Sequence, residues 1–196
     1  MTTATKLMSL EEFFTYDDGT DTCYELENGE LLVMPPESEI NRRIASLLFA
    51  YFFKGGILPQ YLSMKTEIVV TGTGPTVRFP DLLVLSEAGV QALEGATRST
   101  ITLEMPPPRL VVEVVSPGTE NVKRDYRYKK SQYEARGIDE YWIVDPIEQK
   151  VTVLVRVEGL YESQVFTGEQ AIDSPFLKEL QIEDSLTAIQ VLSGKI

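Results

Sequence analysis

The chain has 196 residues, of which 43% are apolar, and its formal net charge is −12. This length favours one domain over residues 1–196, large enough to bury a hydrophobic core. Histidine is absent, which excludes Ser-His and Cys-His nucleophile systems and zinc sites that need imidazole ligands. A single cysteine, Cys23, excludes an internal disulfide and a four-cysteine zinc site. Any catalysis must therefore use carboxylates, lysine, tyrosine or a hard metal ion such as magnesium.

No apolar run approaches the roughly 20 residues that a transmembrane helix needs, so no membrane association is expected. Residues 1–6 lack the charged and apolar regions of a signal peptide. Together with the lone cysteine, these features favour a cytoplasmic location.

The acidic net charge argues against nonspecific adhesion to nucleic acid. One segment departs from this balance, because residues 123–136 carry a charge of +4 and the rest of the chain −16. Its six basic residues are Lys123, Arg124, Arg127, Lys129, Lys130 and Arg136. Taken alone, this segment is interpreted first as a solvated helix face.

The N-terminal third of the chain predicts a helix, a hairpin and a second helix. Ser9-Leu10-Glu11-Glu12 resembles a capping box, which predicts a short helix through about Tyr16. Residues 24–33 predict a β-hairpin, since Asn28-Gly29 suits a type I′ turn. Apolar residues recur at i, i+4, i+7 and i+8 over residues 39–53, which predicts an amphipathic helix that ends at Gly55-Gly56.

The rest of the chain predicts strands and one long helix. Residues 86–104 indicate a short helix after Ser86 followed by a loop. A helix is predicted over about residues 121–135, ended by Gly137, and its place between two strands favours their parallel pairing. The predicted fold class is therefore α+β, with a mixed central sheet flanked by helices. The predicted strands are 65–71, 80–85, 109–115, 140–144 and 151–156.

Two acids interrupt apolar strands. Glu113 lies in Leu110–Val115, where an ionised carboxylate costs several kcal/mol unless a cation or hydrogen bonds accompany it. Asp81 follows Pro80 at the start of another apolar run. Two carboxylates on neighbouring strands, with the backbone carbonyl of residue 114, supply the oxygen ligands that Mg²⁺ prefers. We therefore expect a metal site at a sheet edge.

The helix after the Glu113 strand supplies a cation for such a site. Asp125, Lys129 and Tyr133 are spaced i, i+4 and i+8, so that they share one helix face. Because the helix directly follows the strand, a lysine in its first turns can reach the attacking water or the scissile phosphate. A surface ion pair between Asp125 and Lys129 is the alternative interpretation, and Tyr133 and Trp142 are expected to be core aromatics.

Pro80-Asp81 followed by Glu113-x-Val115 resembles the PD-(D/E)XK nuclease superfamily, with valine at the usual lysine position 115. Within it, the chain resembles the Uma-two family of putative restriction endonucleases over nearly its whole length. The other segments that carry the resemblance are Tyr24-Glu25-Leu26, Gly29-Glu30-Leu31, Val112–Pro117, Arg124–Lys129 with Tyr133, Gly137–Pro146, Ser174-Pro175-Phe176 and Leu180.

The resemblance implies a restriction-endonuclease-like core and a lysine delivered from the following helix. That lysine is assigned to Lys129, with the adjacent Lys130 as the alternative, and Glu25 is a further acid implied near the site. Many family members carry a histidine near the start of the first long helix, where this chain has Asn41. This departure is expected to matter little.

The sequence thus predicts an Mg²⁺- or Mn²⁺-dependent endodeoxyribonuclease. Asp81 and Glu113 would hold the metal and Lys129 would position the water and stabilise the developing charge. The basic helix would contact DNA phosphates, and backbone N–H groups of residues 116–119 are a further candidate for phosphate contacts.

Three alternatives stay open at this point. The same fold can serve as a binding or assembly module without catalysis, which the acidic net charge favours. A small-molecule enzyme on this scaffold would need a closed pocket too narrow for duplex DNA. A homodimer is also compatible with the sequence, because one small acidic domain offers limited surface for DNA.

Overall fold

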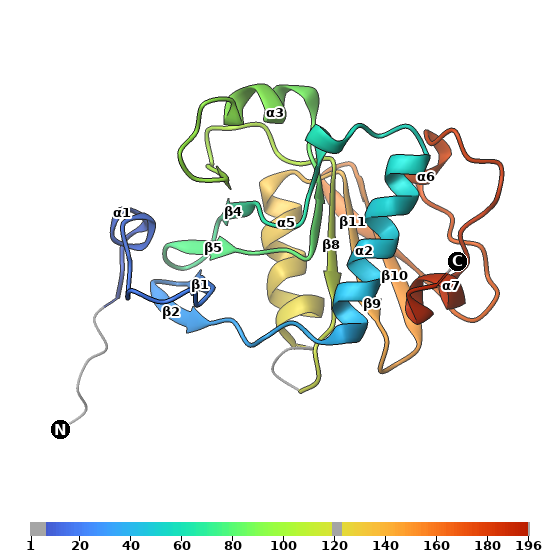
Figure 1. The fold of residues 1–196 in the computed structure, drawn as a ribbon, viewed down its shortest axis with the longest axis horizontal. Coiled ribbons are helices and arrows are strands. Elements are labelled where there is room, and N and C mark those ends of the chain that lie inside the picture. Colours follow the sequence, from blue (N-terminus) through green and yellow to red (C-terminus); the bar gives the residue numbers. More distant parts are fainter. Residues whose placement is uncertain (1–6, 119–122, 196) are drawn as a thin grey trace.

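The computed structural model describes residues 7–118 and 123–195, and in this part of the chain the strands form two sheets (Figure 1). The smaller sheet has the order β2-β1-β5-β4-β7. Its strands are β1 (Tyr24–Glu27), β2 (Glu30–Val33), β4 (Glu67–Val70), β5 (Thr76–Arg78) and β7 (Thr100–Ile101).

The larger sheet has the order β11-β10-β9-β8-β6-β3 and carries the chain's main core. Its one parallel pair joins β8 to β9, and the other pairs are antiparallel. Its strands are β3 (Leu62–Ser63), β6 (Leu82–Val84), β8 (Leu110–Val114), β9 (Glu140–Asp145), β10 (Lys150–Val157) and β11 (Leu160–Phe166).

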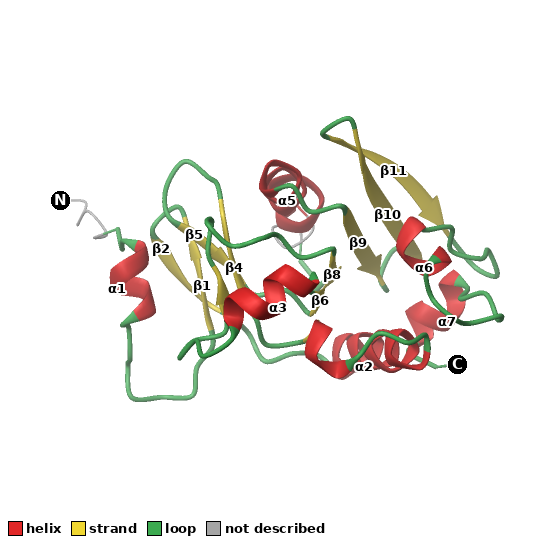
Figure 2. Ribbon diagram, turned by 90° about the horizontal axis from the view of Figure 1, so that it is seen from above, coloured by secondary structure: helices red, strands yellow, loops and turns green. Residues whose placement is uncertain are grey.

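Helices cover both faces of the larger sheet, with α5 on one side of β8 and α2 with α7 on the other (Figure 2). The fold class is therefore α+β, as the sequence predicts, although the strands divide between two sheets. The helical elements are α1 (Leu10–Phe14), α2 (Glu39–Lys54), η1 (Pro59–Tyr61), α3 (Glu87–Leu93), η2 (Arg124–Lys129), α5 (Lys130–Arg136), α6 (Pro175–Lys178) and α7 (Ala188–Ser193).

Local sequence signals explain where several elements begin and turn. Ser9 caps α1, with Glu12 completing the capping box, as predicted. The turn between β1 and β2 places Asn28 and Gly29 at positive φ, which a type I′ hairpin turn requires at both central residues. Ser86 caps α3, so the predicted short helix after this residue is confirmed.

The helix predicted over residues 121–135 differs from the expectation in its first part. Residues 121 and 122 lie outside the described residues, as does Thr119 of the predicted phosphate-binding loop. Arg124–Lys129 forms a π-helical turn, which the α-helix α5 then continues. Gly137 ends α5 in the left-handed conformation, as predicted. Such π turns occur often at functional sites.

Side chains of β8 alternate between the two cores. Val112 and Val114 pack with α2 and α7, whereas Val111 and Val115 pack with α5. Glu113 therefore points to the α5 side of the sheet, because alternate residues of a strand share one face. The parallel pairing of β8 with β9 brings the helix that joins them across this same face.

We expect truncation of the Phe52 side chain to destabilise the protein strongly. Its side chain is 0% exposed and packs edge-on against Trp142 and Phe176. Phe52→Ala should lower the free energy of unfolding by about 3–5 kcal/mol, because it removes buried area and leaves a cavity. Denaturant unfolding monitored by circular dichroism measures this change.

The neighbouring residue Phe53 provides the matched control, since it is 52% exposed on the same helix. Phe53→Ala should change the unfolding free energy by no more than about 0.5 kcal/mol. Equal losses in the two variants would contradict the placement of α2 against the larger sheet.

Candidate functional site

The buried carboxylate of Glu113 is neutralised by Lys129. Glu113 is 4% exposed and Lys129 is 2% exposed, and Lys129 Nζ lies 2.8 Å from Glu113 Oε2. The lysine comes from the π turn η2, directly after the strand that carries the glutamate. The cation required by an acid in an apolar strand is therefore supplied from the following helical segment.

Tyr133, one turn further along, occupies the other oxygen of this carboxylate. Its hydroxyl donates a hydrogen bond of 2.6 Å to Glu113 Oε1. Burial raises the pKa of Tyr133 well above its usual value, and the charge of Glu113 adds to this effect. The phenol therefore stays neutral and acts as a donor. The prediction that Tyr133 is a core aromatic is correct, but this residue also contacts the acid.

Glu25 reaches the same cluster from the smaller sheet. Its Oε1 lies 3.7 Å from Lys129 Nζ and accepts a hydrogen bond from the backbone N–H of Phe79. Arg78 donates to its Oε2 at 3.1 Å. Burial alone would raise the pKa of Glu25, but the charges of Lys129 and Arg78 outweigh burial and lower it. Glu25 is thus a charged link between the two sheets.

Arg78 is itself held by three acceptors. Besides Glu25, its guanidinium donates to Glu27 Oε1 at 2.6 Å and to Gln132 Oε1 at 2.9 Å. The arginine is 0% exposed, so these bonds compensate for the loss of hydration. Because Gln132 lies on α5, this network fixes the smaller sheet against the helix that carries Tyr133.

Lys129 stays protonated in this surrounding. Burial would lower its pKa, but the carboxylates of Glu113, Glu25 and Asp125 outweigh burial and raise it. Asp125 is also buried, and its Oδ1 lies 3.4 Å from Lys129 Nζ. Within the described residues this oxygen has no hydrogen-bond partner. A lysine with a raised pKa cannot act as a base near neutral pH, so its chemical role is that of a fixed cation.

Asp81 lies at the start of β6, beside the end of β8. Its Oδ2 accepts a hydrogen bond of 2.6 Å from the backbone N–H of Val114, the residue after Glu113. Burial and the nearby charge of Glu113 raise the pKa of Asp81 to about 8. The structure thus brings both predicted metal ligands, Asp81 and Glu113, to adjacent ends of paired strands.

Asn41, which stands where many family members carry a histidine, contacts the site, although the sequence analysis expects this departure to matter little. Its side-chain N–H group lies 3.2 Å from both the carbonyl oxygen of Val114 and Ser116 Oγ. The amide is oriented in turn by Ser38, the N-cap of α2, whose hydroxyl donates to Asn41 Oδ1. Asn41 therefore touches the carbonyl that was expected to serve as a metal ligand. The sequence signals for this residue were its position at the family's histidine and its place in the capped first turn of α2.

A cavity of about 580 Å³ opens beside Asp81. Asp81, Asn41, Ser116 and Arg124 belong to its lining, whereas Glu113 and Lys129 are buried behind these residues.

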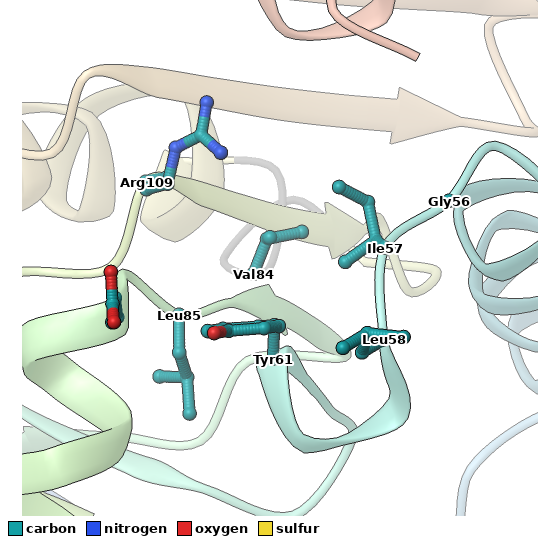
Figure 3. Close-up of a pocket in the computed structure, with 8 residues that line it drawn as sticks. Gly56, Ile57, Leu58, Tyr61, Val84, Leu85 and Arg109 are labelled. Atoms are coloured by element: carbon teal, nitrogen blue, oxygen red, sulfur yellow. The ribbon is translucent and has the colours of Figure 1, made fainter. Parts of the chain in front are cut away.

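A second cavity of about 280 Å³ lies at the opposite ends of β6 and β8, near Val84 and Arg109 (Figure 3). It is remote from the predicted site because Asp81 and Glu113 occur at the other ends of these strands. Its lining residues therefore give no support to the predicted chemistry.

The donor set fits a hard divalent cation in part. The oxygens of Asp81, Glu113 and the Val114 carbonyl are the ligand type that Mg²⁺ prefers. Burial, and after it the charge of Glu113, raise the pKa of Asp81, so a cation beside it would stabilise its ionised form. In residues 7–118 and 123–195, however, no group of three or more Asp, Glu, Cys or His side chains is placed to hold a metal ion. A bound Mg²⁺ would thus depend on few protein ligands and keep several waters.

Comparisons with known proteins agree with this architecture. The model of the Uma2 family, described as "Putative restriction endonuclease", matches residues 10–188. A crystal structure described as a putative nuclease belonging to DUF820, from Anabaena variabilis ATCC 29413, superposes with a TM-score of 0.69. The two chains are 18% identical, and the match covers 95% of this chain and 98% of the other. No curated protein sequence matches the chain.

We expect the raised pKa of Asp81 to make the stability of the metal-free protein depend on pH. A raised folded-state pKa favours the protonated carboxyl, so its stabilising contribution is complete below pH 3.8 and is lost as pH rises towards about 8. Asp81→Asn should therefore become progressively more stable than the wild type across this interval. Denaturant unfolding at a series of pH values in EDTA measures the difference.

Asp139→Asn is the control, because the side chain of Asp139 is exposed before β9. Its stability difference from the wild type should change little over the same interval. If the difference in unfolding free energy between Asp81→Asn and the wild type were also independent of pH, the pKa of Asp81 would not be raised in the folded protein.

Proposed function

Because the chain belongs to the Uma2 family, we propose that it is a divalent-metal-dependent nuclease that hydrolyses phosphodiester bonds of DNA. The observation that carries this proposal is the contact of 2.8 Å between Lys129 Nζ and Glu113 Oε2, with Asp81 at the adjacent strand end. An acid pair with a nearby lysine is the set of groups that this hydrolysis needs. In this chain the helix provides that lysine, since position 115 is a buried valine.

Each residue has a distinct role in the proposed reaction. Asp81 and Glu113 would hold Mg²⁺ or Mn²⁺, which when bound lowers the pKa of a water and neutralises charge on a phosphate. Lys129 stays cationic and would stabilise the negative charge that develops on the phosphate oxygens. Tyr133 and Glu25 orient Glu113 and Lys129, and Asn41 fixes the Val114 carbonyl.

A second candidate function is a nuclease-like fold that binds without catalysis. Both oxygens of Glu113 already have partners, Lys129 and Tyr133, so a metal ion would have to share or displace them. Together with the lack of a three-acid cluster in the described part of the chain, this favours weak metal binding.

No helix among the described residues is long and apolar enough to cross a membrane. Residues 1–196 are proposed to form one domain, and a homodimer remains a proposal.

We expect metal binding to stabilise the protein. A ligand that binds only the folded state at a hundred times its dissociation constant adds about 2.7 kcal/mol to the unfolding free energy. In thermal unfolding experiments, increasing Mn²⁺ should raise the unfolding temperature of the wild type and leave that of Asp81→Asn unchanged. If Mn²⁺ has no effect on the wild type at millimolar concentration, the second candidate function replaces the first.

We expect cleavage to depend on Lys129 and not on its neighbour. Lys129→Gln should lower the cleavage rate of plasmid DNA in Mg²⁺ by about 10²–10³-fold, the cost typical of losing one charge-stabilising donor. Lys130→Gln is the matched control and should keep the wild-type rate, because Lys130 is adjacent and only half-buried. Equal losses in both variants would contradict the assignment of Lys129.

Removal of Lys129 leaves Glu113 buried without its cation, which can cost about 3–5 kcal/mol of stability. Glu113→Gln therefore tests the same site with a neutral side chain of matching shape. This variant should fold and lose cleavage in Mg²⁺, and EDTA should abolish cleavage by the wild type. Full activity of a folded Glu113→Gln protein would exclude the proposed site.

A further inference from the structure

The cavity beside Asp81 has a composition that a metal and a phosphate do not explain. It is lined by one residue each of β2, α2 and η2 and otherwise by connecting segments, and its volume of about 580 Å³ lies in the range of small-molecule sites. Asp81 and Ser116 mark its boundary with the proposed catalytic groups. The rest of its lining extends away from these groups towards the hairpin β1-β2.

Much of the wall is apolar. Met34 and Phe79 are half-buried, and Pro80 is buried. Flat apolar surfaces and aromatic rings are the groups on which unpaired nucleobases stack or pack. The apolar lining residues are Val33, Met34, Pro35, Pro36, Met64, Phe79 and Pro80.

The charged groups of the cavity lining favour different parts of a nucleotide, its base and its phosphate. Arg124 and Lys65 are the cations of the lining. Arg124 Nε has no hydrogen-bond partner among the described residues, and its nearest anion is Asp125 Oδ1 at 3.7 Å. Asp21 and Glu37 belong to the lining as well. Carboxylates repel a phosphate but accept hydrogen bonds from the amino groups of bases. The part of a nucleotide that enters the cavity is therefore its base, while a phosphate lies at Arg124.

A paired base cannot enter such a cavity, since its edge and both faces are occupied within the duplex. We infer that the cavity binds one unpaired base of a DNA strand, so that the adjacent phosphate lies at Arg124. The preferred substrate is then single-stranded or locally unpaired DNA. This inference rests on the proposed nuclease function for its biological meaning, but the binding step needs no catalysis.

Cys23 provides a direct probe, because it is exposed, lines the cavity and is the only thiol of the chain. Circular single-stranded DNA should protect Cys23 from alkylation in EDTA. The relaxed duplex circle of the same sequence should require about tenfold more DNA for equal protection. Mass spectrometry of the intact full chain measures the alkylated fraction. Equal protection by the two forms, or no protection by the single strand, would overturn the inference.

Arg124→Gln and Arg127→Gln form a matched pair on η2. Arg124 lines the cavity, whereas Arg127 is exposed on the same turn. Arg124→Gln should raise the single-strand concentration for half protection by about tenfold, because it removes a charge-assisted phosphate contact. Arg127→Gln removes an equal charge outside the cavity lining and should have a clearly smaller effect. Equal effects would indicate nonspecific attraction to the basic segment and would overturn the cavity assignment.

The protection assay separates this inference from the proposed function. Protection by single strands without cleavage in Mg²⁺ or Mn²⁺ would retain the base-binding cavity and reject the nuclease. Cleavage without protection of Cys23 would retain the nuclease and reject the cavity.

Discussion

The contact between Lys129 and Glu113 is the interaction on which the organisation of this protein depends. A carboxylate at 4% exposure and an ammonium at 2% exposure tolerate burial only because each compensates for the lost hydration of the other. The pairing fixes the π turn against β8 and leaves Tyr133 one turn later in contact with the same carboxylate. Glu25, held by Arg78, adds a second acid to the lysine and ties the smaller sheet to this centre.

The same compensation shapes the proposed chemistry. Since Lys129 remains protonated, it offers charge stabilisation and no proton acceptance. Asp81 differs, because it borders a cavity and because burial, with the nearby charge of Glu113, raises its pKa. A cation and a phosphate are thus expected at Asp81, at the boundary between the buried ion pair and the open cavity. The buried groups determine the electrostatic field at Asp81, and the shape and lining of the cavity determine which molecules can bind there.

Patterns of one or a few residues were sufficient to predict most of the fold. The capping box at Ser9 and the Asn28-Gly29 turn were confirmed, as was the parallel pairing around the basic helix. Four strands, β3, β5, β7 and β11, were missed for physical reasons. β3 and β7 have only two residues each, too few for an alternating pattern. β5 has only three residues after a glycine-rich turn, and β11 is an edge strand whose largely exposed residues give little alternation. The π turn was also missed, because one extra residue per turn leaves hardly any trace in apolar spacing.

The sequence by itself determined the kind of chemistry that is open to this protein. The printed residues alone show that histidine is absent and that each of two apolar strands contains one acid. Because side chains alternate along a strand, they also place Glu113 on the same strand face as Val111 and Val115. Only the tertiary structure decided that Lys129 is the lysine that contacts Glu113, that Glu25 approaches from another sheet and that Asn41 holds the Val114 carbonyl. Those choices depend on contacts between residues far apart in the chain, which no local pattern records. The cavity beside Asp81 has the same origin, since its walls come from separate segments that meet only after folding.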